Sequence, residues 1–442
     1  MAAGAFGRAD LGLGMKKILL GSAALVFLGA TVPAPATDMP IKGPVYKAPE
    51  PIYDWSGLYV GVYTGVGMTQ TRGLDPIGGI VGVVEHTGTG FAGGLTTGYN
   101  WQFNRNWVVG IEGDIGYLGL SHNVRDHNEA LFYNTKTSWT GTLRGRVGYT
   151  SGPTLTYITA GGALVDVKDS IASGAVAAAS SKTESGFVVG TGVETMLGGN
   201  WTAKAESLYY DLGKGNTLTG AGFTLQNDKN RYQVMKFGFN YLFGGKMQPM
   251  LPSHNWTGFY AGGFAGTALT EETATSNSTG IIGNNGGGLN AGGLAGYNWQ
   301  FAPHWVAGIE GDFGYFGVDH ANSNYNDSSR TLGLSTSWLA TARGRLGYST
   351  GPALLYVTGG GAWVDLKDKW TVGAAPVSSS KTFSGGAIGG GIETVLGGNW
   401  TSKTEYLYVN AGKGNVLTSG GITEQADHTF HVFRSALIYK FE

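Results

Sequence analysis

The chain contains two copies of one sequence, so its fold must be one that can form twice in succession. Residues 98–117 read GYNWQFNRNWVVGIEGDIGY and residues 296–315 read GYNWQFAPHWVAGIEGDFGY, with 15 of 20 positions identical. The match continues at a spacing of 198 to 201 residues, with Trp55 corresponding to Trp256 and Trp201 to Trp400. A repeat of about 190 residues is far longer than a solenoid or propeller unit. We therefore predict two domains, residues 55–243 and 256–442, joined by a linker at 244–255.

The N-terminus carries the features of a secretory signal peptide. Met15-Lys16-Lys17 is a basic start, residues 18–30 are apolar, and Ala34-Pro35-Ala36 places small residues at a cleavage site. The apolar stretch has 13 residues, fewer than the ~20 that a membrane-spanning helix needs. We predict a signal peptide at 1–36, with Met15 as an alternative true start, and a proline-rich periplasmic linker at 37–54.

The composition narrows the fold class further. Glycine accounts for 78 of 442 residues and aromatic residues for 53, whereas charged residues make up only 13%, about half the usual ~25%. Thirteen prolines without a three-residue period exclude collagen, and the many apolar residues argue against disorder. A formal charge of −1 predicts no nucleic-acid partner. The absence of cysteine excludes disulfides and thiolate metal sites.

Within each repeat, side chains alternate between an apolar and a polar face. From Trp107 to Tyr117, large apolar residues take most alternate positions, with an aromatic residue at each end, and Glu112 and Asp114 fall on the other face. A period of two is typical of β-strands. A soluble sandwich also alternates, but its outer face would rarely be so rich in glycine.

The connections between the predicted strands distinguish a membrane barrel from a sandwich. Short turns such as 104–105, 151–152 and 198–199 alternate with long polar loops near 68–90, 121–136, 169–182 and 213–229. The eight strands of the first repeat are predicted near 56–67, 91–103, 106–120, 137–150, 153–168, 183–197, 200–212 and 230–243. This arrangement is typical of an all-β, transmembrane, antiparallel up-and-down barrel, which pairs every backbone group as hydrocarbon demands.

Several segments resemble one protein family. Trp55-Ser-Gly-Leu-Tyr-Val-Gly opens the first strand, Tyr241-Leu-Phe243 ends the last strand of repeat one, and the Met-Lys-Lys leader and proline-rich linker precede them. These segments resemble the small porin-like immunogenic outer-membrane proteins of alpha-proteobacteria. The resemblance covers both repeats and implies eight-stranded barrels of the outer-membrane protein A type, exported through the periplasm to the cell outer membrane. That family normally has one barrel, whereas this chain has two copies.

The resemblance also implies an assembly signal at the C-terminus. In the family this signal ends on a terminal aromatic residue, whereas here Phe441 is followed by Glu442. Tyr439 and Phe441 preserve the alternation and are the candidate signal residues for the barrel-insertion machinery.

Projecting the alternation inward places four acidic and four basic residues inside each repeat. In repeat one these are Glu112, Asp114, Glu194 and Glu206 with Arg144, Arg146, Lys204 and Lys236. In repeat two they are Glu310, Asp312, Glu393 and Glu405 with Arg343, Arg345, Lys403 and Arg434. An eight-stranded barrel is only wide enough for side chains, and buried charges must be paired. We predict a structural ion network that closes each lumen, in preference to a catalytic carboxylate pair at Glu112 and Asp114.

The two repeats could form two barrels or one barrel of sixteen strands. The self-balanced charge sets and the 12-residue segment 244–255 favour two tandem barrels. Extended at ~3.3 Å per residue, that segment could reach a neighbouring barrel. The alternative, a sixteen-stranded barrel, would match a general porin with a water-filled channel.

No other motif predicts a catalytic, metal or cofactor site. Gly190-Thr-Gly192 and Gly389-Gly-Gly391 lack the following helix that a phosphate-binding loop needs. The eight histidines lack metal-ligand spacing. Asp126-His127 and Asp319-His320 have no identifiable nucleophile beside them.

We therefore expect a non-enzymatic outer-membrane protein without a cofactor, whose partners are outer-membrane lipid and the insertion machinery. The family resemblance implies a role in envelope integrity and surface exposure, with limited passage of small solutes. One alternative is a sixteen-stranded diffusion porin, in which the inward charges would set ion preference. A second is a surface adhesin or receptor that acts through loops such as 270–288, which are rich in Asn, Ser, Thr and Gly.

Overall fold

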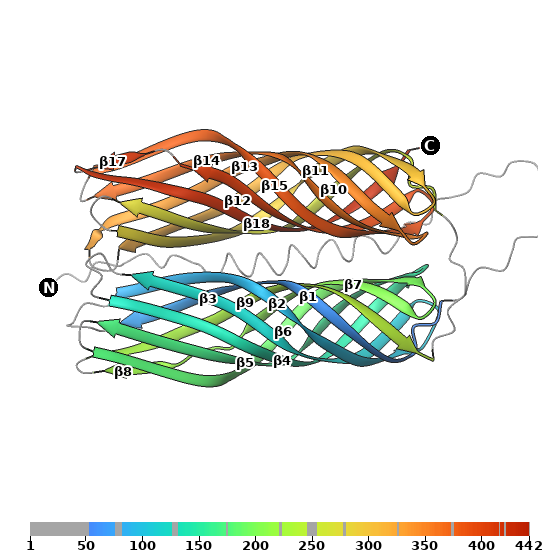
Figure 1. Ribbon diagram of the computed structural model, residues 1–442, viewed down its shortest axis with the longest axis horizontal. Coiled ribbons are helices and arrows are strands. Elements are labelled where there is room, and N and C mark those ends of the chain that lie inside the picture. Colours follow the sequence, from blue (N-terminus) through green and yellow to red (C-terminus); the bar gives the residue numbers. More distant parts are fainter. Residues whose placement is uncertain are drawn as a thin grey trace, which may run out of the picture.

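The computed structural model contains two closed β-barrels that lie side by side (Figure 1). It describes residues 53–75, 82–125, 131–173, 176–220, 223–244, 254–276, 280–324, 327–372, 375–414, 416–419 and 421–441. The predicted signal peptide, nearly all of the first linker and most of the second lie outside the described residues. Among the described residues, no helix is long and apolar enough to cross a membrane.

Eight long antiparallel strands form each barrel, and one short strand extends the last hairpin. The first barrel has β1 Gly57–Asp75, β2 Gly82–Gln102, β3 Trp107–Arg125, β4 Leu131–Ser151, β5 Thr154–Ser173, β6 Val176–Gly198, β7 Trp201–Asp211, β8 Thr217–Gly220 and β9 Phe223–Phe243. The second has β10 Gly258–Ser276, β11 Gly280–Ala302, β12 Trp305–Asn324, β13 Asp327–Ser349, β14 Ala353–Val372, β15 Ala375–Gly397, β16 Trp400–Lys413, β17 Leu417–Ser419 and β18 Ile422–Lys440.

Each ring closes on itself. Strand β1 pairs with β9 from Leu58–Phe243 onwards, and β10 pairs with β18 from Tyr260–Lys440 onwards. The long strands otherwise follow chain order, as in an up-and-down barrel. The predicted fold of two tandem eight-stranded barrels is therefore confirmed, and the sixteen-stranded alternative is excluded.

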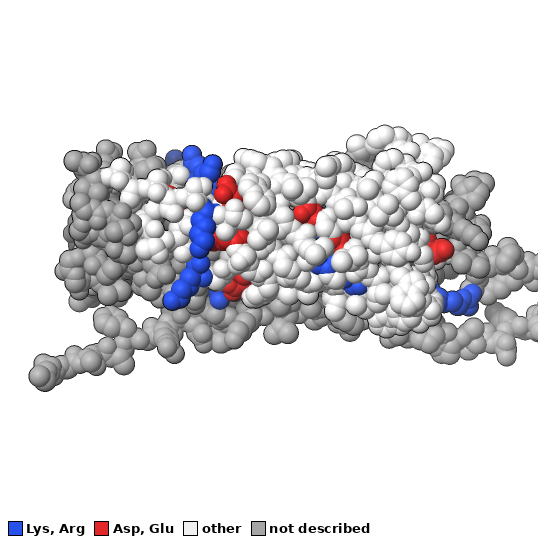
Figure 2. All heavy atoms as spheres, turned by 90° about the horizontal axis from the view of Figure 1, so that it is seen from below, with Lys and Arg blue, Asp and Glu red and all other residues white. Residues whose placement is uncertain are grey.

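A belt of apolar side chains surrounds each barrel, as the alternation predicts. Four side chains of β3 are exposed: Trp107, Ile111, Ile115 and Tyr117. On the neighbouring strand β4, Trp139 pairs with Tyr117 and is also exposed. The ten-residue rise from Trp107 to Tyr117, at ~3.3 Å per residue and ~40° of tilt, spans ~25 Å, the height of a barrel's apolar band. Figure 2 shows one outer face that is largely uncharged, with basic side chains in a row towards one end.

This basic row marks the limit of the belt on the first barrel. Lys136, Lys168 and Lys182 are exposed on β4, β5 and β6, and the first two are directly paired across their strands. We call this end of each barrel the loop end. The opposite end, which holds the connections 103–106 and 199–200, is the turn end.

The strands are longer, and the loop-end connections shorter, than predicted. Strand β1 continues to Asp75 instead of ending near residue 67, and β9 begins at Phe223 instead of near residue 230. The expected loop at 270–288 consists mainly of the ends of β10 and β11. The turn ends agree with prediction to within one or two residues. The predicted loops were too long because the pattern of apolar side chains inverts beyond the belt.

Beyond the belt, apolar residues point inward and polar residues point outward. On β5, Val165 and Val167 are fully buried, whereas Lys168, the residue after Val167, is exposed. The surroundings explain the inversion, because the belt faces lipid and this part faces water. A search for apolar outward faces therefore detects only the membrane-spanning part of each strand.

The two barrels contact each other through residues that would otherwise face lipid. Met235 on β9 and Phe433 on β18 point away from their own lumens, yet both are buried in one cluster with Met68. Thr89 also donates a hydrogen bond to Glu271 of the second barrel at 3.1 Å. Both barrels have their loop ends on the same side (Figure 1), so the pair can occupy one bilayer.

Candidate functional site

The interior of the first barrel contains a network of ion pairs. Arg144 on β4 is its centre, with its guanidinium 2.5 Å from Glu112, 2.6 Å from Asp114 and 2.8 Å from Glu206. These partners come from β3 and β7, so the network joins strands that are not neighbours. The remaining predicted cations each contact one of the same acids or Glu194. Arg146 lies 2.9 Å from Glu194, Lys204 lies 2.8 Å from Glu112, and Lys236 lies 2.9 Å from Asp114.

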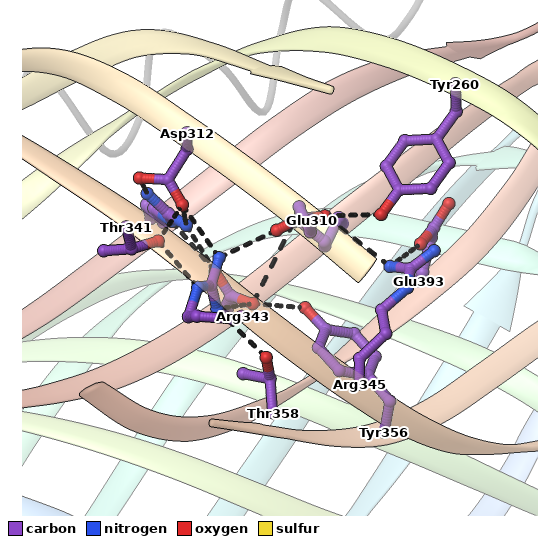
Figure 3. Close-up of polar contacts among 12 residues, drawn as sticks. Tyr260, Glu310, Asp312, Thr341, Arg343, Arg345, Tyr356, Thr358 and Glu393 are labelled. Carbon is purple, nitrogen blue, oxygen red and sulfur yellow. Dashed lines mark hydrogen bonds and ion pairs between the residues drawn. The ribbon is translucent and has the colours of Figure 1, made fainter. Parts of the chain in front are cut away.

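The second barrel repeats this network (Figure 3). Arg343 lies 2.8 Å from Glu310, 2.9 Å from Asp312 and 3.0 Å from Glu405. The other pairs are Arg345 with Glu393 at 2.9 Å, Lys403 with Glu310 at 2.7 Å, and Arg434 with Asp312 and Glu405 at 2.8 Å. All sixteen predicted residues therefore point inward, and none is more than 7% exposed.

Tyrosine side chains complete both networks. Tyr59 donates a hydrogen bond to Glu112 at 2.7 Å, and Tyr157 donates one to Glu206 at 3.1 Å. The guanidinium of Arg146 lies between their rings, 4.7 Å and 5.1 Å from the two centroids. Tyr260, Tyr356 and Arg345 repeat this arrangement in the second barrel. The buried charges thus have hydrogen-bonded and aromatic partners, which offset the free energy of removing them from water.

The geometry does not favour a catalytic carboxylate pair. Glu112 and Asp114 lie on the same face of β3, but both are bound to Arg144 and neither side chain is more than 1% exposed. Glu112, Asp114 and Glu206 lie close enough to offer ligand atoms to a metal ion. Arg144 contacts all three, so the space between them already holds a cation.

A layer of apolar side chains covers the network on its loop-end side. In the first barrel, Leu118, Val188, Leu208 and Val234 are members of one fully buried cluster inside the ring. In the second barrel, Phe316, Val364, Leu407 and Phe430 belong to the matching cluster, and the rings of Phe316 and Phe430 are 5.2 Å apart. Each lumen is therefore filled by a charged layer and an apolar layer in series.

Beyond the apolar layer, the first barrel has a third layer of neutral amides and two acids. Asp169 accepts hydrogen bonds from Thr135 at 2.6 Å and from Asn216 at 2.9 Å. Glu184 accepts one from Asn230 at 2.7 Å. Burial is the main cause that raises the pKa of Glu184 to about 7. This layer lies at the level of the exposed Lys168 and Lys182, outside the lipid belt.

At the corresponding level, the second barrel has an acidic cluster with a histidine. Glu272 and His428 are paired across β10 and β18, and Asp368 extends from β14 on another side of the ring. The His428 ring lies 3.4 Å from Asp368 and 3.9 Å from Glu272. This cluster could not be predicted from the sequence, because its members lie on three strands and have no short spacing. The available signal was inward alternation beyond the belt, and one member, Glu272, lies in the segment 270–288 that we had predicted as a loop.

The candidate assembly residues lie at the turn end of β18. Tyr439 and Phe441 are partly exposed, with ring centroids 5.5 Å apart, and Trp400 packs against Tyr439 at 5.1 Å. They belong to the aromatic residues at the turn-end limit of the belt.

Fold and lumen together define a class of protein: a transmembrane β-barrel with a side-chain-filled interior, present twice in one chain. Residues 22–243 and 245–441 each match the family model for the outer membrane protein beta-barrel domain. The chain therefore belongs to this family and resides in the outer membrane.

Relatives of the chain confirm the family resemblance. It is 32% identical over 246 residues to the 31 kDa outer-membrane immunogenic protein of Brucella melitensis, which covers 52% of this chain and all of the relative. It is 35% identical over 200 residues to the 22 kDa outer membrane protein of Rhizobium leguminosarum, covering 45% of this chain and 81% of the relative. Among solved structures, Neisserial surface protein A matches with 16% identity and a TM-score of 0.24, over 42% of this chain and all of that chain.

Proposed function

We propose that this protein is a non-conducting, non-enzymatic barrel pair that strengthens the outer membrane and displays its loop end at the cell surface. The observation that carries the proposal is the filled interior. Arg144 and Arg343 each bind three acids inside their own barrel, and a buried apolar layer follows in series.

A hydrated ion that crossed either barrel would have to displace both layers. The charged layer resists displacement because removing one member strands its buried partners. The apolar layer resists wetting because its residues offer no hydrogen bonds. Outward-facing aromatic residues at both limits of the belt anchor the pair in lipid. This supports a mechanical role, with outer-membrane lipid as the main partner.

Single-channel recording of the refolded mature chain, residues 37–442, tests the proposal in a planar bilayer. Folding is checked first by the slower gel mobility that heating produces in a β-barrel, and a sixteen-stranded porin serves as the conducting control. We expect no stable current steps from the folded chain. Large, ohmic steps from folded protein would refute the proposal and favour solute transport.

We further infer that Tyr439 and Phe441 act as the assembly signal for the insertion machinery. Their place at the end of the closing strand supports this role. Phe441→Ala should lower the yield of folded barrel in cells but leave the refolded protein as stable as the wild type. An unchanged yield would refute it.

A further inference from the structure

The acid–histidine cluster at the loop end of the second barrel has the chemistry of a metal site. We propose that Glu272, Asp368 and His428 bind one divalent transition-metal ion of the zinc type. The buried acid Glu424 lies on the same strand as His428. Each of the first three residues can offer one ligand atom, and these atoms lie within 4.8 Å of one another. All three side chains are buried.

The histidine is the observation that points to a metal. His428 is 0% exposed, and neither of its ring nitrogens makes a hydrogen bond. Both nitrogens point at carboxylates, Nε2 towards Asp368 and Nδ1 towards Glu272. Buried polar groups normally have hydrogen-bond partners, so a fully buried imidazole without one needs an explanation. A metal ion would provide it, because neutral imidazole nitrogen is a common metal ligand.

The charge of the cluster supports the same conclusion. Among the residues that the structure describes, neither Asp368 nor Glu424 forms an ion pair with a lysine or arginine. Asp368 Oδ1 and Glu424 Oε1 also make no hydrogen bond. The His428 ring, 3.4 Å away, is a charged partner for Asp368 when it is protonated, but one imidazole does not balance several buried carboxylates. A divalent cation would supply the positive charge that Arg343 supplies in the network below.

The first barrel provides an internal comparison at the same positions of the sheet. There Thr71 pairs with Asn230, where the second barrel pairs Glu272 with His428. Asp169 corresponds to Asp368, but the Thr135 hydroxyl that hydrogen-bonds Asp169 is replaced by Leu334.

The second barrel has therefore lost a hydrogen-bond donor for its aspartate and gained a histidine and an acid around it. Together, the histidine, the added acid and the aspartate form a ligand set.

The ligand types indicate which metal would bind. Mg²⁺ and Ca²⁺ prefer oxygen ligands alone, whereas one imidazole with two carboxylates suits Zn²⁺ and its neighbours. The ligands come from β10, β14 and β18, so the ion would tie together distant sides of one ring. We expect binding to raise the thermal stability of the second barrel.

Zinc binding to the untagged, refolded mature chain tests the proposal, with a chromophoric chelator as competitor. The wild type should bind one tight zinc ion per chain. His428→Asn introduces the residue that the first barrel has at this position. It should weaken binding by about 100-fold or more, since loss of even an outer-shell contact costs 10–100-fold. Asp169→Asn is the matched control in the first barrel and should bind like the wild type.

Two binding results would overturn the proposal: no saturable zinc binding by folded wild type, or equal affinity in wild type and His428→Asn. X-ray absorption of the zinc-loaded wild type does not depend on any variant folding. It should show imidazole scattering together with oxygen ligands, and a spectrum with oxygen alone would also refute the site. The conductance test of the proposed function is independent of both measurements.

Discussion

Removal of Arg144 should destabilise the first barrel more than any surface change. Arg144 is fully buried and forms three ion pairs, with Glu112, Asp114 and Glu206. Its replacement by alanine leaves four buried acids opposite three cations. Removing one partner of a single buried pair typically costs 3–5 kcal/mol. Because three acids lose a partner here, we expect Arg144→Ala to lower the free energy of unfolding by about 4 kcal/mol or more.

A second variant separates charge imbalance from simple loss of packing. Arg144→Ala combined with Glu206→Ala removes one cation and one acid, so three of each remain in the network. Glu206 is chosen because it binds Arg144 directly and also accepts a hydrogen bond from Tyr157. If stranded charge is the main effect, the double variant should be more stable than Arg144→Ala alone. This outcome requires a favourable coupling between the two sites, which a double-mutant cycle measures.

The assay is reversible unfolding in urea, with the protein in phospholipid vesicles and tryptophan fluorescence as the signal. Lys168→Ala, at an exposed position of the same barrel, is the control and should change stability by no more than about 0.5 kcal/mol. A loss of less than 1 kcal/mol for Arg144→Ala would refute the buried network as a major source of stability. A double variant no more stable than the single one would refute the role of charge balance.

Three further changes test other parts of the structure. Leu143→Arg puts a charge on the lipid face at mid-belt and should cost about 2–4 kcal/mol in vesicle unfolding; an unchanged midpoint would mean that this face does not contact lipid. Gly98→Ala should reduce the yield of folded barrel, because an added Cβ would lie 2.2 Å from the Tyr59 hydroxyl; a normal yield would contradict this. Glu184 has a raised pKa, from 4.5 to about 7, so its ionisation destabilises the folded state as the pH rises through that range. Glu184→Gln should therefore gain up to about 3 kcal/mol over wild type at pH 8 and nothing at pH 4, and parallel stability curves would contradict this.

The membrane-spanning part of the fold could be predicted from the sequence because two simple rules apply there. Lipid requires apolar residues outside, and a period of two then assigns every other residue to the lumen. A shift of one residue would turn the whole set outward, so Trp107 and Tyr117 on the lipid face determine that Glu112 and Asp114 point inward. The particular pairs could not be predicted, because they depend on how the ring brings β3, β4 and β7 together.

The loop-end part could not be predicted because the solvent changes there from lipid to water. Val165 and Val167 point inward, as in a soluble barrel, and the outward residues are polar. The pattern changes phase without any break in the strand, so a single rule applied along β5 predicts an end that does not exist. The cluster around His428 was missed for the same reason.

The two barrels also show which parts of the lumen the fold itself requires. Of the eight network positions, seven carry the same residue in both repeats, and the eighth changes only from Lys236 to Arg434. A change at one of these positions leaves a buried charge without its partner, so single substitutions are disfavoured. The loop-end layer is less restricted, because besides Asp169 and Glu184 its first-barrel form contains neutral amides, whose replacement does not leave a charge without its partner. The repeats differ in chemistry there, since His428 of the second barrel stands where the first barrel has Asn230. Any activity that distinguishes the barrels should therefore be sought at the loop end.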